Sequence, residues 1–229
     1  NFIGYDQLSS KAEILAIIKD DNLITNLNDD KAIIVTDQTP FYPEGGGQVA
    51  DLGSIIGPDG SFLVQDVKEV SNWILHIGTV EGRINVADIV EMKTDTKLRS
   101  DTAKNHTATH LLHKALRQVL GEHAEQKGSL VEANRLRFDF THLTSLKKEE
   151  IREIESLVNQ AVLSMYDIES ISTDIETARE MGAIALFGEK YDEEVRVVKV
   201  DDFSMELCGG THVKNTGEIG LFKIISEGS

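Results

Sequence analysis

Two short segments of the sequence carry the residue types that most often bind metal ions. His106 and His110 lie four positions apart in the segment His-Thr-Ala-Thr-His, and Cys208 and His212 lie four apart in Cys-Gly-Gly-Thr-His. On an α-helix, residues four apart project from the same face, so the first two imidazoles can share one ion. A thiolate and a third imidazole would complete a tetrahedral shell of the kind that zinc prefers over magnesium or calcium. The sequence therefore predicts a zinc site built from these four residues.

Each pair also has an ordinary structural interpretation. A histidine pair at helical spacing arises readily in a chain with 7 histidines, and a single cysteine is compatible with a buried thiol. A thiol nucleophile at Cys208, activated by a histidine, is a further alternative, although four donors exceed what such a dyad needs. His113 lies on the same stripe of the expected helix, so it is either a rival ligand or a partner that orients His110.

A run of three glycines and the residues after the expected metal helix are the other candidate binding segments. Gly45, Gly46 and Gly47 precede Gln48, and such a run is useful where the backbone bends sharply or a ligand passes closely. An ordinary wide turn is the alternative. Gln126 is placed to hold a substrate hydroxyl or amide, with a surface glutamine as the alternative. Several basic residues near these motifs are candidates for phosphate contacts: Lys97, Arg99, Lys104, Lys127, Arg135, Arg137 and Lys190.

The composition indicates a soluble globular protein in a reducing compartment. The 229 residues suffice for one large domain or two small ones, and 40% of them are hydrophobic. The single cysteine excludes an internal disulfide and is typical of a cytoplasmic protein. No apolar run approaches the roughly 20 residues of a membrane helix, and the first residues do not resemble a signal peptide. Because the chain begins without methionine, we expect it to be a piece of a longer protein.

The formal net charge is −16, and an acidic protein repels nucleic acid at long range. A polyanionic partner would therefore need a local basic patch or affinity from other domains.

The expected elements divide the chain into two domains, at residues 1–96 and 97–229. The first domain is predicted to be a small β-barrel, with glycine- and proline-containing turns between short strands. We expect a short helix at residues 10–20 and strands at 31–36, 61–67, 70–80 and 87–93.

The second domain is predicted to be α+β, with helices packed on an antiparallel sheet that carries the zinc site. Apolar residues recur at helical spacing over residues 98–120, and Gly121 favours an end there. A second helix is expected to begin with Ser145 as its N-terminal cap. The remaining predictions are a short helix at 177–181 and strands near 130, 135–140, 195–200 and 219–225.

Taken together, the motifs resemble the editing domain of bacterial-type alanyl-tRNA synthetases. The matching segments are Phe-Tyr-Pro-Glu-Gly-Gly-Gly-Gln, His-Thr-Ala-Thr-His-Leu-Leu-His, Gln-Lys-Gly-Ser-Leu-Val, Arg-Leu-Arg-Phe-Asp-Phe-Thr-His and Cys-Gly-Gly-Thr-His. The resemblance covers nearly the whole chain. Threonyl-tRNA synthetases share a version of the second half but lack the glycine block of the barrel.

The resemblance implies zinc at His106, His110, Cys208 and His212. It implies hydrolysis of the ester that joins a wrong amino acid, chiefly serine and also glycine, to alanine tRNA. The hydroxyl-recognising glutamine of the family corresponds to Gln126, and catalytic roles are expected for Gln126, His106 and His110. Contacts to the substrate or tRNA are expected from Gly45, Gly46, Gly47, Gln48, Lys127 and Lys190.

The partners that the resemblance implies are the acceptor end of alanine tRNA and the remaining synthetase domains, where aminoacylation and ATP binding would reside. A free-standing deacylase and a zinc-stabilised tRNA-binding module without hydrolysis remain alternatives. Four protein ligands describe a closed metal shell, whereas catalytic zinc usually keeps one position open. No carboxylate in the sequence identifies itself as a general base.

Overall fold

The fold is that of a computed structural model, which describes residues 1–185 and 193–228. The chain forms two compact units. The first contains Asn1–Gly45 and Val49–Ser100, and the second contains Gly46–Gln48 and Asp101–Ser229. Between Ser100 and Asp101 the division lies inside the helix Thr96–Leu120, while the boundary predicted from the sequence is at 96/97. The segment Gly46–Gln48, however, belongs to the second unit although the strands on both sides of it belong to the first.

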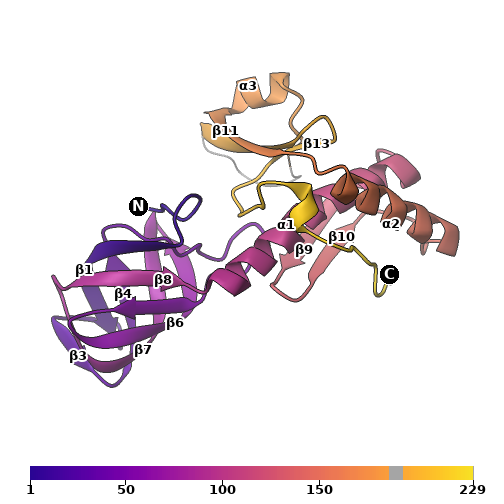
Figure 1. The fold of residues 1–229 in the computed structure, drawn as a ribbon. Coiled ribbons are helices and arrows are strands. Elements are labelled where there is room, and N and C mark those ends of the chain that lie inside the picture. The colour runs from indigo at the N-terminus through magenta and orange to yellow at the C-terminus, as the bar shows by residue number, and fades with distance from the viewer. Residues whose placement is uncertain (186–192, 229) are drawn as a thin grey trace. The chain divides into compact units, whose positions relative to one another are not determined.

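The first unit is a closed antiparallel β-barrel, as predicted (Figure 1). Its ring runs β1-β4-β7-β6-β5-β8 and closes where β8 pairs with β1, while β2 and β3 add short pairings to β1 and β7. Side chains that alternate inward along these strands, such as Phe62 and Val64, fill the core. The strands are β1 (Ser9–Lys19), β2 (Asn22–Ile24), β3 (Asn26–Asn28), β4 (Lys31–Thr36), β5 (Gly53–Ile56), β6 (Asp59–Val70), β7 (Trp73–Asn85) and β8 (Ile89–Thr94).

The predicted helix at residues 10–20 is wrong, because this segment is strand β1. Ile14 and Ile17 are both fully buried, and a spacing of three suggests a helix. The register between β1 and β4 shifts between Ile14 and Ala16, so the strand does not keep strict alternation. Because of this bulge, the buried residues of the strand have a spacing that is typical of a helix.

The predicted strand at 70–80 is in fact the end of β6 and the start of β7. Ser71 and Asn72 adopt φ values of 50° and 68° and form the turn between the two strands. Two consecutive left-handed residues give the tight turn whose twist matches that of a hairpin.

His76 is a fully buried histidine in the barrel, and its hydrogen bonds select the neutral ring. Its Nδ1 lies 3.0 Å from the Ile34 carbonyl oxygen, so Nδ1 carries the hydrogen. Its Nε2 lies 2.8 Å from the Thr39 hydroxyl, which donates to it. Burial lowers the pKa of His76 to about 4.

This pKa predicts that the barrel loses stability as the pH falls from about 6.5 towards about 4. In that window the unfolded chain binds a proton at His76 and the folded barrel does not. The free energy of unfolding should fall by up to ~1.4 kcal/mol per pH unit from this group. Urea denaturation followed by circular dichroism across this range should show a shallower pH dependence for His76→Gln. Parallel slopes for the two proteins would contradict the assignment.

Arg99 and Asp51 form a buried ion pair in the first unit. The Arg99 Nε donates to both Asp51 carboxylate oxygens at 2.9 Å, and its Nη atoms donate to the carbonyl oxygens of Gly4 and Pro40. Asp51 also accepts from the backbone N–H of Tyr42. Arg99 is therefore occupied inside the fold, and the structure gives it a structural role in place of the expected phosphate contact.

The second unit consists of helices, a hairpin and a three-stranded antiparallel sheet, as the α+β prediction requires (Figure 1). Its elements are α1 (Thr96–Leu120), which begins in the first unit, then β9 (Gln126–Val131), β10 (Leu136–Phe140), α2 (Lys148–Leu163), β11 (Ile168–Asp174), α3 (Ile175–Glu180), β12 (Glu194–Val200), β13 (Ser204–Leu207) and a 3-10 turn at Thr216–Glu218. The predicted apolar face of α1 is buried in one cluster with that of α2, where Leu111 and Ile154 are fully buried. Gly121, with φ of +108°, ends α1 as expected. No helix in the described residues is long and apolar enough to cross a membrane.

Two expectations for this unit are wrong. Helix α2 is capped by Lys147 and not by Ser145, because the Lys147 backbone N–H donates to the Glu150 carboxylate at 2.7 Å. The segment 219–225 forms no strand, since side chains of α2 satisfy its backbone. Asn159 exchanges two hydrogen bonds with the backbone of Phe222, and Glu155 accepts from the N–H of Ile224.

Candidate metal centre

The structure brings together the four residues that the sequence singles out as metal ligands. Helix α1 presents His106 and His110 one turn apart, and the loop after β13 supplies Cys208 and His212. One donor atom from each side chain lies within 4.8 Å of all the others. The Cys208 Sγ lies 3.4 Å from the His106 Nε2 and 3.3 Å from the His212 Nε2.

These distances fit a shared metal ion. Zinc bonds of about 2.3 Å to sulfur and about 2.0 Å to nitrogen, at a tetrahedral angle, place the two donor atoms roughly 3.5 Å apart. Burial disfavours the thiolate of Cys208, but the imidazoles of His106 and His212 outweigh it and hold the pKa of the thiol well below its usual value. The thiolate is the form that binds metals. The cluster therefore has the donor types, the spacing and the charge of a metal centre.

Thr107 fixes the ring of His212. The Thr107 hydroxyl donates to the Ala103 carbonyl oxygen at 3.0 Å, so its oxygen is left to accept. It accepts from the His212 Nδ1 at 3.1 Å and from the Val213 N–H at 3.2 Å. The hydrogen of a neutral His212 is thus on Nδ1, and the Nε2 lone pair faces the cluster.

Two glycines of the predicted motifs are required by close packing. A Cβ on Gly210 would meet the His106 ring and would lie 2.9 Å from the Gln48 Oε1. Gly47 has φ of +81°, and a Cβ there would lie 2.7 Å from the Ser129 carbonyl oxygen. Gly46, also at positive φ, has nothing within 4 Å of a built Cβ. The glycine run therefore lets the chain approach β9, and Gly46 leaves open space beside it.

The other predicted site residues have different surroundings. Gln48 is fully buried and belongs to the same unit as the cluster, with its amide against His106 and Thr211. Gln126 is half-buried at the start of β9, where its amide donates to the Ser129 hydroxyl at 3.3 Å. Lys127 is exposed, and its amine lies 3.1 Å from a carboxylate oxygen of Glu125. Lys190 lies outside the described residues.

His113 lies outside the group of four donors and pairs with a carboxylate that the sequence did not single out. Its Nδ1 lies 3.2 Å from the buried Glu206, which also accepts from the Ser204 hydroxyl. Burial raises the pKa of Glu206, but the charge of His110 and the hydrogen bond from His113 outweigh it and lower that pKa. A charged residue at an inward position of a strand, two residues before Cys208, was the signal available in the sequence.

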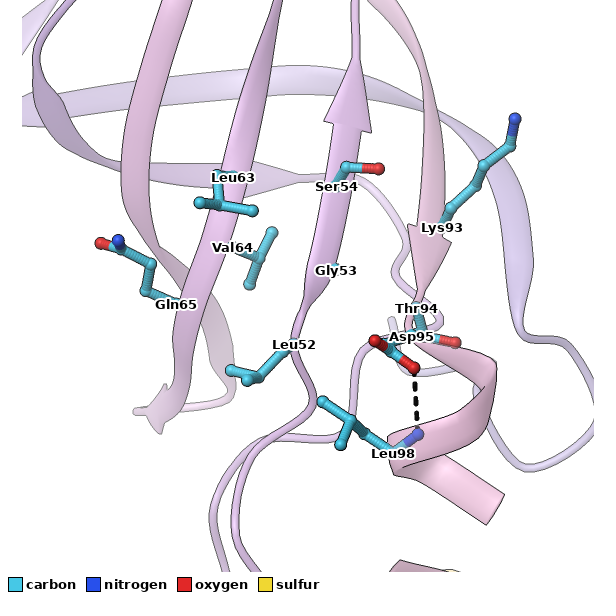
Figure 2. A pocket seen from close by; sticks show the side chains of 10 residues that line it. All are labelled: Leu52, Gly53, Ser54, Leu63, Val64, Gln65, Lys93, Thr94, Asp95 and Leu98. Carbon is cyan, nitrogen blue, oxygen red and sulfur yellow. Dashed lines mark hydrogen bonds between the residues drawn. The ribbon is translucent and has the colours of Figure 1, made fainter. Parts of the chain in front are cut away.

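A cavity of about 570 Å³ in the first unit contains none of the predicted site residues (Figure 2). Leu52, Leu63 and Leu98 line it, and its charged side chains are Lys93 and Asp95. The Asp95 carboxylate accepts from the backbone N–H of Leu98 at 3.0 Å and so caps the start of α1. The side chains that line this cavity form no cluster of reactive groups. The four donor side chains His106, His110, Cys208 and His212 lie in the second unit.

Comparison with protein families gives two matches. Residues 1–98 match the family of class II (A) tRNA synthetases. Residues 195–229, which include Cys208 and His212, match the second additional domain of threonyl and alanyl tRNA synthetases.

Individual relatives agree with the family matches. The chain is 52% identical over 230 residues to an alanine–tRNA ligase of Francisella tularensis subsp. tularensis, and the alignment covers 100% of this chain and 27% of that protein. It is also 52% identical over 231 residues to the alanine–tRNA ligase of Carboxydothermus hydrogenoformans, of which it covers 26%. The chain thus spans about a quarter of the length of the relatives that it matches.

Proposed function

We propose that this chain removes wrongly attached amino acids from alanine tRNA. The chain belongs to the alanine–tRNA ligase family and is a region about a quarter as long as its relatives. The substrates are tRNA molecules charged with serine and, secondarily, with glycine. The observation that carries this proposal is the convergence of His106, His110, Cys208 and His212, within a chain whose whole length aligns with about a quarter of these ligases.

Zinc is the ion that we assign to the centre, because three imidazoles and one thiolate suit it better than they suit magnesium or calcium. When bound, zinc would supply either polarisation of the ester carbonyl or a water molecule of lowered pKa. In the hydrolysis itself, a water oxygen bonds to the carbonyl carbon, the bond to the ribose oxygen breaks, and that oxygen takes up a proton. The role that we assign to His106 and His110 is to hold the metal ion beside the ester that reacts.

Gln126 is the residue that we assign to the choice between serine and alanine. The two amino acids differ by one hydroxyl, and a site that hydrogen-bonds this group rejects alanine because its own polar atoms would stay unpaired. The Gln126 amide nitrogen donates to the hydroxyl of Ser129. This leaves the amide oxygen to accept a hydrogen bond from the hydroxyl of a serine attached to the tRNA.

Contact with tRNA is proposed to be local, at the acceptor end. A net charge of −16 opposes a broad electrostatic interface. We assign phosphate and backbone contacts to the glycine run at Gly45 and Gly46 and to Lys127 and Lys190. The remaining synthetase domains would supply most of the affinity, in the cytoplasm.

The test is incubation of the chain with serine-charged and alanine-charged tRNA, with and without a chelator. Loss of the serine ester that stops when the chelator is added would support the proposal. A closed shell of four protein donors favours one alternative, a metal-stabilised tRNA-binding module. Binding of the charged tRNA without ester loss, in metal-loaded protein, would establish that module and refute hydrolysis.

Replacing Gln126 with alanine is expected to lower the preference for serine over alanine roughly 10- to 100-fold, because one buried hydrogen bond to the hydroxyl is lost. Metal content should stay at the wild-type level. The measurements are deacylation rates on both charged tRNAs and metal analysis of the same preparation.

Gln160→Ala is the matched control, since the Gln160 amide also donates to a serine hydroxyl at 3.3 Å but lies exposed on α2. An equal loss of metal and of discrimination in Gln126→Ala would show that this residue supports the fold and not the choice of substrate.

A further inference from the structure

Gln48 has the burial and the contacts of a residue that positions a metal ligand without binding the metal itself. It is 0% exposed, so its amide faces protein on all sides. One of its neighbours is the ligand His106, and the other is Thr211, which immediately precedes the ligand His212 in the chain.

The orientation of the Gln48 amide follows from its contacts. The backbone N–H of Thr211 can only donate, and it lies 2.9 Å from the atom assigned as Oε1. The other amide atom, Nε2, donates to the Thr211 hydroxyl at 3.0 Å. Oε1 also lies 2.6 Å from the His106 Nδ1, and an oxygen acceptor requires that this nitrogen carry a hydrogen.

A neutral His106 with its hydrogen on Nδ1 has its lone pair on Nε2, the atom that faces the Cys208 sulfur at 3.4 Å. We propose that Gln48 is a positioning residue that holds His106 in this tautomer and ring orientation, ready to bind the metal. This inference rests on the metal centre of the proposed function and does not depend on hydrolysis.

The segment around Gln48 is built to keep the amide in place. The Gly47 carbonyl accepts from the Val131 N–H at 2.8 Å, and Gln48 itself forms a bridge to Val131 on β9. On the other side, Gly210 comes so close that a Cβ there would lie 2.9 Å from Oε1. The amide is thus enclosed by β9 and by the loop that carries Cys208.

The experiment compares the zinc affinity of the wild-type chain with that of Gln48→Met and Gln48→Glu, by competition with a chelator of known affinity. Methionine keeps the length of the side chain and removes the acceptor, so we expect affinity to fall about 10- to 100-fold, the usual cost of losing such a partner. Glutamate keeps an acceptor for His106 and should stay within a few-fold of wild type. Gln160→Met is the control at an exposed position.

A Gln48→Met protein that folds by circular dichroism and binds zinc as tightly as wild type would overturn the proposal. If that variant does not fold, nitrogen NMR of the wild-type chain decides. We expect the His106 hydrogen on Nδ1 both with and without zinc, and an Nδ1 that carries no hydrogen would overturn the proposal. Failure of the wild type to hydrolyse serine-charged tRNA would refute the proposed function and leave these measurements unaffected.

Discussion

Replacing Cys208 with alanine is expected to abolish stoichiometric zinc binding and to slow hydrolysis of serine-charged tRNA by more than about 100-fold. The loss should exceed the 10- to 100-fold cost of removing an outer hydrogen-bond partner, because the thiolate is itself a ligand. It is also the one negative charge among the four donors. Metal analysis after gel filtration and single-turnover deacylation are the two measurements.

These two readouts also separate the metal centre from the alternative of a thiol nucleophile. If Cys208 were a nucleophile and not a ligand, its loss would stop hydrolysis without removing a donor to the ion, so the zinc content would not change. Full zinc content together with lost hydrolysis would therefore support the nucleophile and contradict our account. His123→Ala is the control, because His123 is an exposed histidine outside the cluster, and it should change neither readout.

Replacing Asp51 with alanine is expected to destabilise the first unit by about 3–5 kcal/mol, which is the usual cost of leaving one member of a buried ion pair without its partner. The side chains of Asp51 and Arg99 are both only 6% exposed, so water cannot replace the lost contact. The Tyr42 N–H would also lose its acceptor. Urea denaturation followed by circular dichroism measures the change.

The double variant Asp51→Leu/Arg99→Leu should be less destabilised than the two single changes together, because it removes both charges. The control is Asp139→Ala, which breaks an exposed pair with Arg137 and should cost less than about 1 kcal/mol. A loss below ~1 kcal/mol in Asp51→Ala would show that the buried pair contributes little to the barrel.

The features that the sequence predicted well are local. His106 and His110 are one helical turn apart, and the apolar spacing of α1 is continuous for several turns, so both the helix and the shared face of the two histidines follow from periodicity. Cys208 and His212 are joined by a short loop, so their convergence needed only the loop to close. The barrel followed from short strands between turns.

The features that the sequence did not predict depend on distant contacts. The Gln48 amide contacts the ring of His106, which is 58 positions away in the chain. No local pattern distinguishes a buried glutamine from one that lines a binding site. The segment 219–225 has the composition of a strand, but Asn159 and Glu155 of α2 take up its backbone groups. In β1, a bulge interrupts the alternation of buried and exposed side chains by which a strand is recognised.

The claim on which the account depends is that one ion is held by one sulfur and three nitrogens. X-ray absorption at the zinc edge, on the chain loaded with one equivalent of zinc, measures this shell. We expect one sulfur at about 2.3 Å and three nitrogens at about 2.0 Å. A shell of oxygen and nitrogen without sulfur would contradict the centre proposed at His106, His110, Cys208 and His212.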